Sequence, residues 1–321
     1  MPLDRGAHRL LKMLAAVSPP AGEARTVAGR RRALEALAEM VEDTPQTAVA
    51  TAELSIPGPG GAIRARLYDP FVPAHPRESG NERKNSGAIV YFHGGGWVAG
   101  GLETHDGVCR RLALGSGLSL IAVDYRLAPE HRFPAALEDA VAAVRWATSQ
   151  ADALGFDPGG LVVAGDSAGG GLAAAVAQSP DRPPLALQVL ICPILNLAED
   201  SASRRDFAQG YFLDAETLAA DLADYCGPHP DLRDPQLSPL LAASLAGLPP
   251  ALIHTAEYDP FRDEGEAYAR RLAEAGVASQ LTRHDGMIHY FYAMPRPIPH
   301  AVQALADIGA QIRQGLDAAT R

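Results

Sequence analysis

The sequence predicts an α/β fold in which helices cover both faces of a mostly parallel sheet. The 321-residue chain is 47% hydrophobic and 21% charged, which is typical of a globular protein with a substantial core. From Gly87 onward, short apolar segments alternate with amphipathic ones, as expected of repeated strand–helix units. Glycine-rich turns follow two of the apolar segments, at the position where parallel sheets bind ligands.

The first 86 residues predict elements that precede this alternating region. Apolar residues recur at helical spacing within the first 45 residues, which predicts two helices. Residues 47–69 alternate in the manner of strands around a Pro- and Gly-rich turn at 57–61. Residues 70–86 are rich in proline, glycine and charge, which predicts an exposed loop.

The alternating region predicts further strands and helices. The expected strands cover residues 88–92, 119–124, 161–164, 187–195, 251–255 and 277–283, and the expected helices cover 135–149, 168–177, 260–275 and 299–316. The interval between Leu195 and Leu248 interrupts this rhythm with proline-rich turns and one apparent helix over 214–225. We interpret this interval as an inserted lid that joins the N-terminal helices over one edge of the sheet.

The charge balance argues against a nucleic-acid partner. The formal net charge is -10, whereas phosphate binding needs clustered positive charge. Arginines do cluster at residues 30–32, but alternating apolar and acidic residues follow them. This pattern is more typical of a solvated helix face than of a binding patch.

Cysteine content and the N-terminal segment predict the compartment. The three cysteines are odd in number and show no C-x-x-C spacing, which favours reduced thiols over disulfides or a metal site. The apolar run at residues 10–17 is broken by Lys12, is too short to span a bilayer and is a poor secretory signal. We therefore expect a soluble cytoplasmic protein without stable membrane insertion.

Ser167 is the candidate nucleophile. It lies in the pentapeptide G-D-S-A-G at residues 165–169, after an apolar strand and before a helix of small residues. A sharp strand-to-helix turn crowds the backbone, so small residues are needed on both sides of the nucleophile. Asp166 is expected to point away from Ser167 in such a turn. The alternative is a glycine-rich turn with an incidental serine.

A second glycine-rich turn supplies candidate oxyanion donors. Residues 93–97 read H-G-G-G-W and follow the strand at 88–92. Backbone N–H groups there, from Gly94 or Gly95, together with that of Ala168, would stabilise negative charge on a carbonyl oxygen. A phosphate-binding turn is the alternative, although no G-x-x-x-x-G-K-[ST] or G-x-G-x-x-G spacing supports a nucleotide.

His289 is the candidate base. Serine is a weak nucleophile that needs an imidazole to accept its proton, and this base should follow the nucleophile in the chain. His289 lies in a loop after the last expected strand, where the base is expected. His284, at the end of that strand, is the alternative.

Asp259 is the candidate acid that orients the base. It follows the expected strand at 251–255, and Pro260 comes next. Asp followed by Pro is also a good helix start, so Asp259 has a plausible structural role as well. Asp263 and Glu257 are the alternatives.

Six motifs together resemble the hormone-sensitive-lipase-like group of α/β-hydrolases, also called family IV bacterial esterases, in its GDSAG subgroup. The motifs are H-G-G-G-W at 93–97, D-Y-R-L-A-P-E at 124–130, G-D-S-A-G-G at 165–170, S-P-L at 238–240, D-P-F-R-D-E at 259–264 and I-H at 288–289. The resemblance covers about residues 91–291. Gly171, where the family often has Asn, and Tyr290, where a small residue often follows the catalytic His, depart from it.

The resemblance implies an architecture. It implies the α/β-hydrolase fold, with an eight-stranded, mostly parallel sheet and a helical cap. The cap would comprise residues 1–45 and the insertion 197–247, and the catalytic core would comprise residues 46–196 and 248–321. Many members are dimers through the edge of the last strand, so a homodimer of this kind is possible here.

The resemblance also implies site roles. Ser167, Asp259 and His289 would form the triad, Gly94, Gly95 and Ala168 would supply the oxyanion hole, and His93 would brace the glycine loop. No cofactor and no metal are expected.

These inferences favour a carboxylic ester hydrolase that acts on short- to medium-chain acyl esters through an acyl-enzyme. The substrate would be a small-molecule ester. An amide or formamide hydrolase with the same triad is an alternative, and so is a small-ligand receptor on the same scaffold. Trp97, Tyr211 and Phe212 are candidates to line the substrate pocket, or ordinary packing residues of the core or cap.

Overall fold

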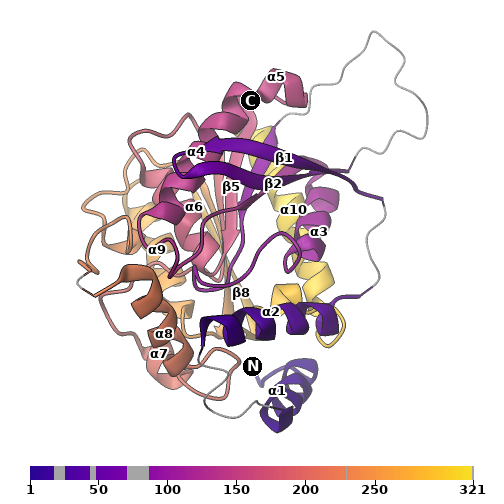
Figure 1. Ribbon diagram of the computed structural model, residues 1–321, viewed down its shortest axis with the longest axis vertical. Coiled ribbons are helices and arrows are strands. Elements are labelled where there is room, and N and C mark those ends of the chain that lie inside the picture. Colours follow the sequence, from indigo (N-terminus) through magenta and orange to yellow (C-terminus); the bar gives the residue numbers. More distant parts are fainter. Residues whose placement is uncertain (18–25, 44–47, 71–86, 229, 320–321) are drawn as a thin grey trace.

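The computed structural model describes residues 1–17, 26–43, 48–70, 87–228 and 230–319, and it contains an eight-stranded sheet between helical layers (Figure 1). The strand order is β1-β2-β4-β3-β5-β6-β7-β8. The predicted fold class is confirmed. Residues 71–86 of the loop expected at 70–86, and the helix break expected at 18–22, lie outside the described residues.

An antiparallel hairpin opens the sheet, and parallel strands continue it. β1 pairs antiparallel with β2, β2 pairs antiparallel with β4, and all later neighbours are parallel. The strands are β1 (Ala50–Gly58), β2 (Gly61–Asp69), β3 (Ala88–Phe92), β4 (Ser119–Asp124), β5 (Leu161–Asp166), β6 (Leu187–Ile191), β7 (Ala251–Tyr258) and β8 (Ser279–Ile288). Strands β3, β5 and β6 are buried along their whole length because helices cover both faces.

Two helical layers bury the two faces of the sheet. In β3, Val90 and Phe92 belong to one hydrophobic cluster and Ile89 and Tyr91 to the other, since successive side chains point to opposite faces. The first cluster includes residues of α4 (Ala135–Ser149), α6 (Ala168–Gln178) and α9 (Arg262–Glu274). The second includes residues of α3 (Asp106–Ser116) and α10 (His300–Ala319), on the opposite side of the sheet (Figure 1).

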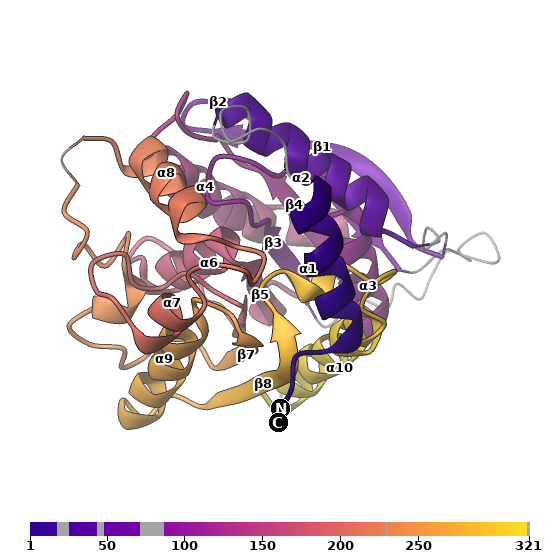
Figure 2. The same ribbon diagram turned by 90° about the horizontal axis from the view of Figure 1, so that it is seen from below.

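Four helices gather at one end of the molecule. They are α1 (Arg5–Val17), α2 (Val27–Val41), α7 (Ala202–Asp206) and α8 (Ala215–Cys226). They lie at the lower end in Figure 1, which Figure 2 shows from below. Short helical segments complete the described chain: α5 (Ala151–Leu154), η1 (Pro158–Gly160), η2 (Pro239–Leu241) and η3 (Phe291–Ala293). No helix of the described residues is long and apolar enough to cross a membrane.

Some strand and helix bounds differ from the sequence-based expectation. The strand expected over 187–195 ends at Ile191, because Cys192 takes a φ of 46° and the next residue, Pro193, has no N–H to donate. The last strand extends to Ile288, so His284 lies within β8 rather than at its end. Helix α3 was not anticipated, since Gly107 and Gly115 weaken its sequence pattern.

Candidate active site

Ser167 lies on a tight turn between β5 and α6. Its backbone has a φ of 51° and a ψ of -118°, a conformation that L-residues rarely adopt. A Cβ at Gly169 would overlap the carbonyl oxygen of Phe92, and a Cβ at Gly165 would overlap the carbonyl oxygen of Gly169. The turn therefore requires glycine on both sides of the serine, and its own hydrogen bonds hold it: Ser167 N–H donates to the carbonyl of Ile191 at 2.9 Å.

The structure brings Ser167, His289 and Asp259 together. His289 follows β8 directly, and its Nε2 lies 3.0 Å from Ser167 Oγ. Its Nδ1 lies 2.8 Å from Asp259 Oδ2. The three residues are 5%, 4% and 0% exposed, respectively. This arrangement allows the imidazole to donate Nδ1–H to the carboxylate and to accept the serine hydroxyl proton at Nε2, as nucleophile activation requires.

Asp259 is held at the start of α9 by its other carboxylate oxygen. Asp259 Oδ1 accepts a hydrogen bond from Phe261 N–H at 2.8 Å, so the residue orients His289 and shapes the turn into the helix. The thiol of Cys192 lies close by: its sulfur, a carboxylate oxygen of Asp259 and a ring nitrogen of His289 are all within 4.8 Å of one another. Burial, and then the nearby carboxylate of Asp259, raise the pKa of this thiol well above its ordinary value.

The alternative bases and acids contact other groups. His284 lies 3.2 Å from His254 and 3.0 Å from His300 through its two ring nitrogens. Glu257 accepts the N–H of Gly286, and Asp263 accepts the N–H of Ser203, each through a carboxylate oxygen.

The glycine loop contacts both the candidate nucleophile pocket and the core. Gly95 and Gly96 line the pocket with Ser167, and both have positive φ, 121° and 64°. A Cβ at Gly95 would overlap the carbonyl of Ala99, so the loop needs glycine there. Gly94 differs, because its N–H donates to Asp166 Oδ1 at 2.9 Å. The expected oxyanion donor at Gly94 is thus already engaged, whereas Gly95 lies at the pocket.

The other expected oxyanion donor is at the start of a helix. Ala168 is the first residue of α6, so its N–H has no acceptor within the helix. It directly follows Ser167, and the residue is fully buried. Its N–H is therefore available near the nucleophile.

Asp166 points away from Ser167 and links three segments. Its carboxylate accepts hydrogen bonds from Tyr91 Oη at 2.6 Å, Tyr292 Oη at 2.8 Å and the Gly94 N–H. His105 Nε2 lies 3.3 Å from it. Burial opposes ionisation of Asp166, yet the charge of His105 and these hydrogen bonds hold its pKa below the ordinary value. This bracing role was not predicted from the sequence, although the residue lies within the nucleophile motif.

His93 supports the same loop. Its Nδ1 lies 2.8 Å from the carbonyl oxygen of Gly94, and its ring stacks on Tyr125 at 4.3 Å between centroids. Tyr125 Oη donates to the carbonyl of His93 at 2.7 Å. Burial, and then the neighbouring His105, lower the pKa of His93 to about 4, which favours its neutral form.

A cavity of about 140 Å³ opens at Ser167 and His289. Phe212 lines it and stacks on Tyr290, with 5.7 Å between ring centroids. Of the other two aromatic candidates, Trp97 is buried against Tyr225 and Tyr211 stacks on Tyr258. Neither is among the described residues that line this cavity.

Arg30 contradicts the expected solvated helix face. Its side chain is buried, lines the same cavity and pairs with acidic residues of α8. Residues 30–32 of the arginine cluster therefore do not share one environment, since Arg32 is exposed.

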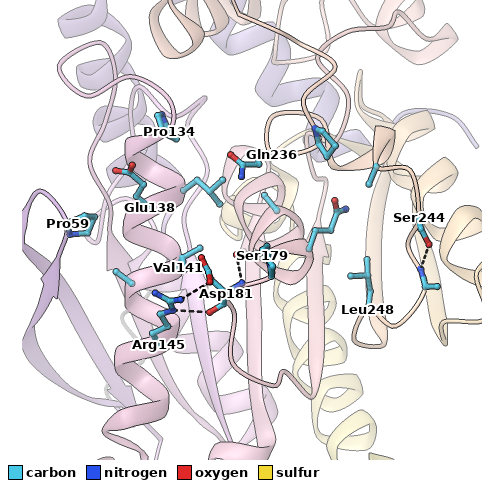
Figure 3. A pocket seen from close by; sticks show the side chains of 18 residues that line it. Pro59, Pro134, Glu138, Val141, Arg145, Ser179, Asp181, Gln236, Ser244 and Leu248 are labelled. Carbon is cyan, nitrogen blue, oxygen red and sulfur yellow. Dashed lines mark hydrogen bonds and ion pairs between the residues drawn. The ribbon is translucent and has the colours of Figure 1, made fainter.

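A larger cavity of about 760 Å³ lies elsewhere, between α4, the end of α6 and residues 235–248 (Figure 3). An ion pair between Arg145 and Asp181, 3.3 Å apart, stands at one side of it. None of the residues that line this larger cavity also lines the cavity at Ser167 and His289.

The comparisons with known proteins agree with this geometry. A family described as having the alpha/beta hydrolase fold matches residues 89–293. This chain belongs to the alpha/beta hydrolase family. The resemblance to the hormone-sensitive-lipase-like group is confirmed by this family match together with relatives named as esterases.

Two curated relatives of this alpha/beta hydrolase illustrate the similarity. "Esterase LipI" of Mycobacterium tuberculosis is 39% identical over 84% of this chain and 85% of its own length. "Ethyl acetate hydrolase" of Pseudomonas putida is 41% identical over 80% of both chains.

Solved structures are similar along almost the whole chain. An ester-hydrolase named EH1AB1, from the metagenome of Lake Arreo, has a TM-score of 0.90 at 38% identity and covers 97% of this chain and 98% of its own. A Pyrobaculum calidifontis esterase has a TM-score of 0.85 at 40% identity and covers 98% and 99%, respectively.

Replacing Asp166 tests the bracing role in this alpha/beta hydrolase. We expect Asp166→Asn to lower kcat about ten- to a hundredfold, because an amide N–H₂ would face donors and let the glycine loop shift. Steady-state kinetics on a short ester would measure the loss. Asp139→Asn is the matched control, since Asp139 is equally buried but pairs with Arg126. An equal loss of kcat in both variants would contradict the prediction.

Two buried histidines, His254 in β7 and His284 in β8, predict a pH dependence of stability. Burial is the main cause that lowers the pKa of His254 to about 3 and that of His284 to about 4. In the unfolded chain, where histidine pKa values are near 6.5, these two side chains bind protons at a higher pH than in the folded protein. The free energy of unfolding is therefore highest above about pH 6.5 and falls as the pH drops below it.

We expect His254→Gln to remove part of the decrease in the free energy of unfolding at low pH. Between pH 7 and 4 the free energy of unfolding should decline by up to about 3 kcal/mol less in the variant than in the wild type. Urea unfolding at each pH would measure it. His131→Gln, at an exposed histidine, should leave the slope unchanged. Parallel pH profiles for wild type and His254→Gln would count against the prediction.

Proposed function

We propose that this protein is a carboxylic ester hydrolase in which Ser167 is the nucleophile, His289 the base and Asp259 the orienting acid. The observation that carries the proposal is the continuous hydrogen-bonded chain from Ser167 Oγ through His289 to Asp259, with links of 3.0 and 2.8 Å. The names of the relatives, which include carboxylesterase and ethyl acetate hydrolase, support the same reaction class.

The proposed reaction has two halves. His289 Nε2 accepts the proton of Ser167 as Oγ attacks the ester carbonyl, and Asp259 stabilises the imidazolium that forms. The N–H groups of Gly95 and Ala168 hold the oxyanion in this proposal. The alcohol leaves with the proton from His289. A water molecule, deprotonated by the same imidazole, then hydrolyses the acyl-enzyme and releases the acid.

Short- to medium-chain esters are the proposed substrates. The cavity of about 140 Å³ at Ser167 suits a small acyl or alcohol arm. Most of its walls are apolar side chains, including Leu34, Phe212 and Leu218. Such walls favour an arm of a few methylene groups through burial of apolar surface.

Residues 1–45 and 197–247 are proposed to form one cap over this site. Helix α2 supplies Arg30 and Leu34 to the cavity, and α8 supplies Thr217, Leu218 and Asp221. Both segments also meet directly, through the ion pair of Arg30 and Asp221. This contact supports a division in which residues 46–196 and 248–321 are the catalytic core.

A reducing compartment, such as the cytoplasm, is also proposed. Cys109, Cys192 and Cys226 are all free thiols. Two of them are buried, so disulfide exchange would require the core to open.

Ester hydrolysis by matched variants would test the triad. We expect the wild type to hydrolyse p-nitrophenyl acetate and butyrate faster than palmitate, and Ser167→Ala and His289→Gln to lower kcat at least about a thousandfold. His284→Gln is the control, because this histidine contacts His254 and His300 rather than Ser167. Equal rates for the wild type and Ser167→Ala on acetate and butyrate would refute the proposal. Faster cleavage of a matched amide than of the ester would instead favour the amide hydrolase alternative.

A homodimer through the edge of β8 is the proposed assembly. β8 is the last strand of the sheet and offers one side to another strand. Leu281, at this strand, is 41% exposed, so a partner would cover apolar surface. Light scattering should give about twice the chain mass of 33.7 kDa, and Leu281→Arg should return it to the mass of one chain. A wild-type mass of one chain would contradict this assembly.

A further inference from the structure

A buried ionic cluster forms part of the wall of the catalytic pocket. Arg30 of α2 and Asp221 of α8 line the same cavity as Ser167 and His289. Arg30 Nε lies 2.8 Å from Asp221 Oδ1, and the Arg30 guanidinium also pairs with Asp224. Arg30 and Asp221 are only 9% and 8% exposed. Charges are rarely buried so completely in a pocket whose other walls are mainly apolar.

The second oxygen of Asp221 faces the glycine loop. A Cβ added to Gly96 would overlap Asp221 Oδ2, so the carboxylate lies against the backbone next to the nucleophile pocket. Gly96 has a φ of 64°, and its lack of a side chain leaves room for this approach. Among the described residues, Asp221 forms its ion pair with Arg30 through Oδ1. Oδ2 is therefore an acceptor at the pocket wall.

Among the described residues, the cluster contains more carboxylates than guanidinium groups. One guanidinium, of Arg30, faces two carboxylates, of Asp221 and Asp224. Desolvation by burial, only partly offset by Arg30, raises the pKa of Asp221 to about 7. The ionised carboxylate is thus incompletely stabilised by the protein, and a donor from a bound molecule would improve its surroundings.

We propose that Asp221 is a specificity-determining residue that selects esters whose acyl or alcohol arm bears a hydrogen-bond donor, a hydroxyl or ammonium group. An alkyl arm would remove water from Oδ2 without replacing its hydrogen bond, whereas a donor on the arm replaces it. The inference rests on the proposed ester hydrolysis and adds the substrate class that this pocket prefers.

Two pairs of isosteric, achiral esters test the preference. Ethyl 3-hydroxypropanoate and ethyl butanoate differ by OH against CH₃ on the acyl arm. The compounds 3-hydroxypropyl acetate and butyl acetate differ in the same way on the alcohol arm. For each pair the ratio of kcat/KM values, hydroxylated over alkyl, is measured by pH-stat titration at pH 8 and divided by the corresponding ratio of alkaline hydrolysis rates.

We expect the corrected ratio to exceed one for at least one arm of the wild type. In Asp221→Leu that ratio should fall about tenfold or more, the effect of one hydrogen bond to a charged group. Asp224→Asn is the matched control, because Asp224 also pairs with Arg30 but does not line the pocket. Its ratio should stay within about threefold of the wild-type ratio.

Two results would overturn the proposal. The first is a corrected wild-type ratio at or below one for both arms, which needs no variant to fold. The second is a folded Asp221→Leu variant whose ratios match those of the wild type. Both differ from a failure of ester hydrolysis itself, in which wild type and Ser167→Ala would cleave all four esters at equal rates.

Discussion

The site depends on one backbone constraint, the tight turn that presents Ser167 between β5 and α6. The positive φ of Ser167 is tolerated because hydrogen bonds on both sides of the turn fix it, including Ser167 N–H to Ile191. Gly169 lets this turn press against the carbonyl of Phe92, at the end of the neighbouring strand β3. The glycine loop starts one residue later, so the same close approach that positions the serine also brings the candidate oxyanion donors beside it.

Asp166 extends this constraint to the rest of the site. It is the last residue of β5, and its buried carboxylate receives Tyr91 from β3, Gly94 from the glycine loop and Tyr292 from the segment after His289. The end of β3, the glycine loop and the segment after His289 are thereby fixed to one anchor. Positions of this kind have no reacting atom, yet a small displacement of the groups that they hold weakens catalysis strongly.

Sequence reasoning identified the groups that lie next to strand ends, since a parallel sheet brings those ends together and their motifs are local. Ser167, His289 and Asp259 meet for this reason. The sequence did not reveal helix α3 or the hydrogen bond that the Gly94 N–H donates to Asp166, because both depend on packing. Trp97 and Tyr211 were placed as pocket candidates by residue type alone, which does not reveal which way a ring points.

The error at Arg30 has the most informative cause. Its sequence surroundings indicate a solvated helix face, because the acidic partners of Arg30 are Asp221 and Asp224, far along the chain on another helix. No periodicity within α2 can reveal a pairing that only the tertiary fold creates. The site residues therefore lie in recognisable motifs because their geometry constrains the backbone locally, whereas the pocket wall from α2 and α8 depends on long-range contacts between these two helices. Differences in selectivity between otherwise similar hydrolases are thus expected to arise in the segments whose sequences are least motif-like.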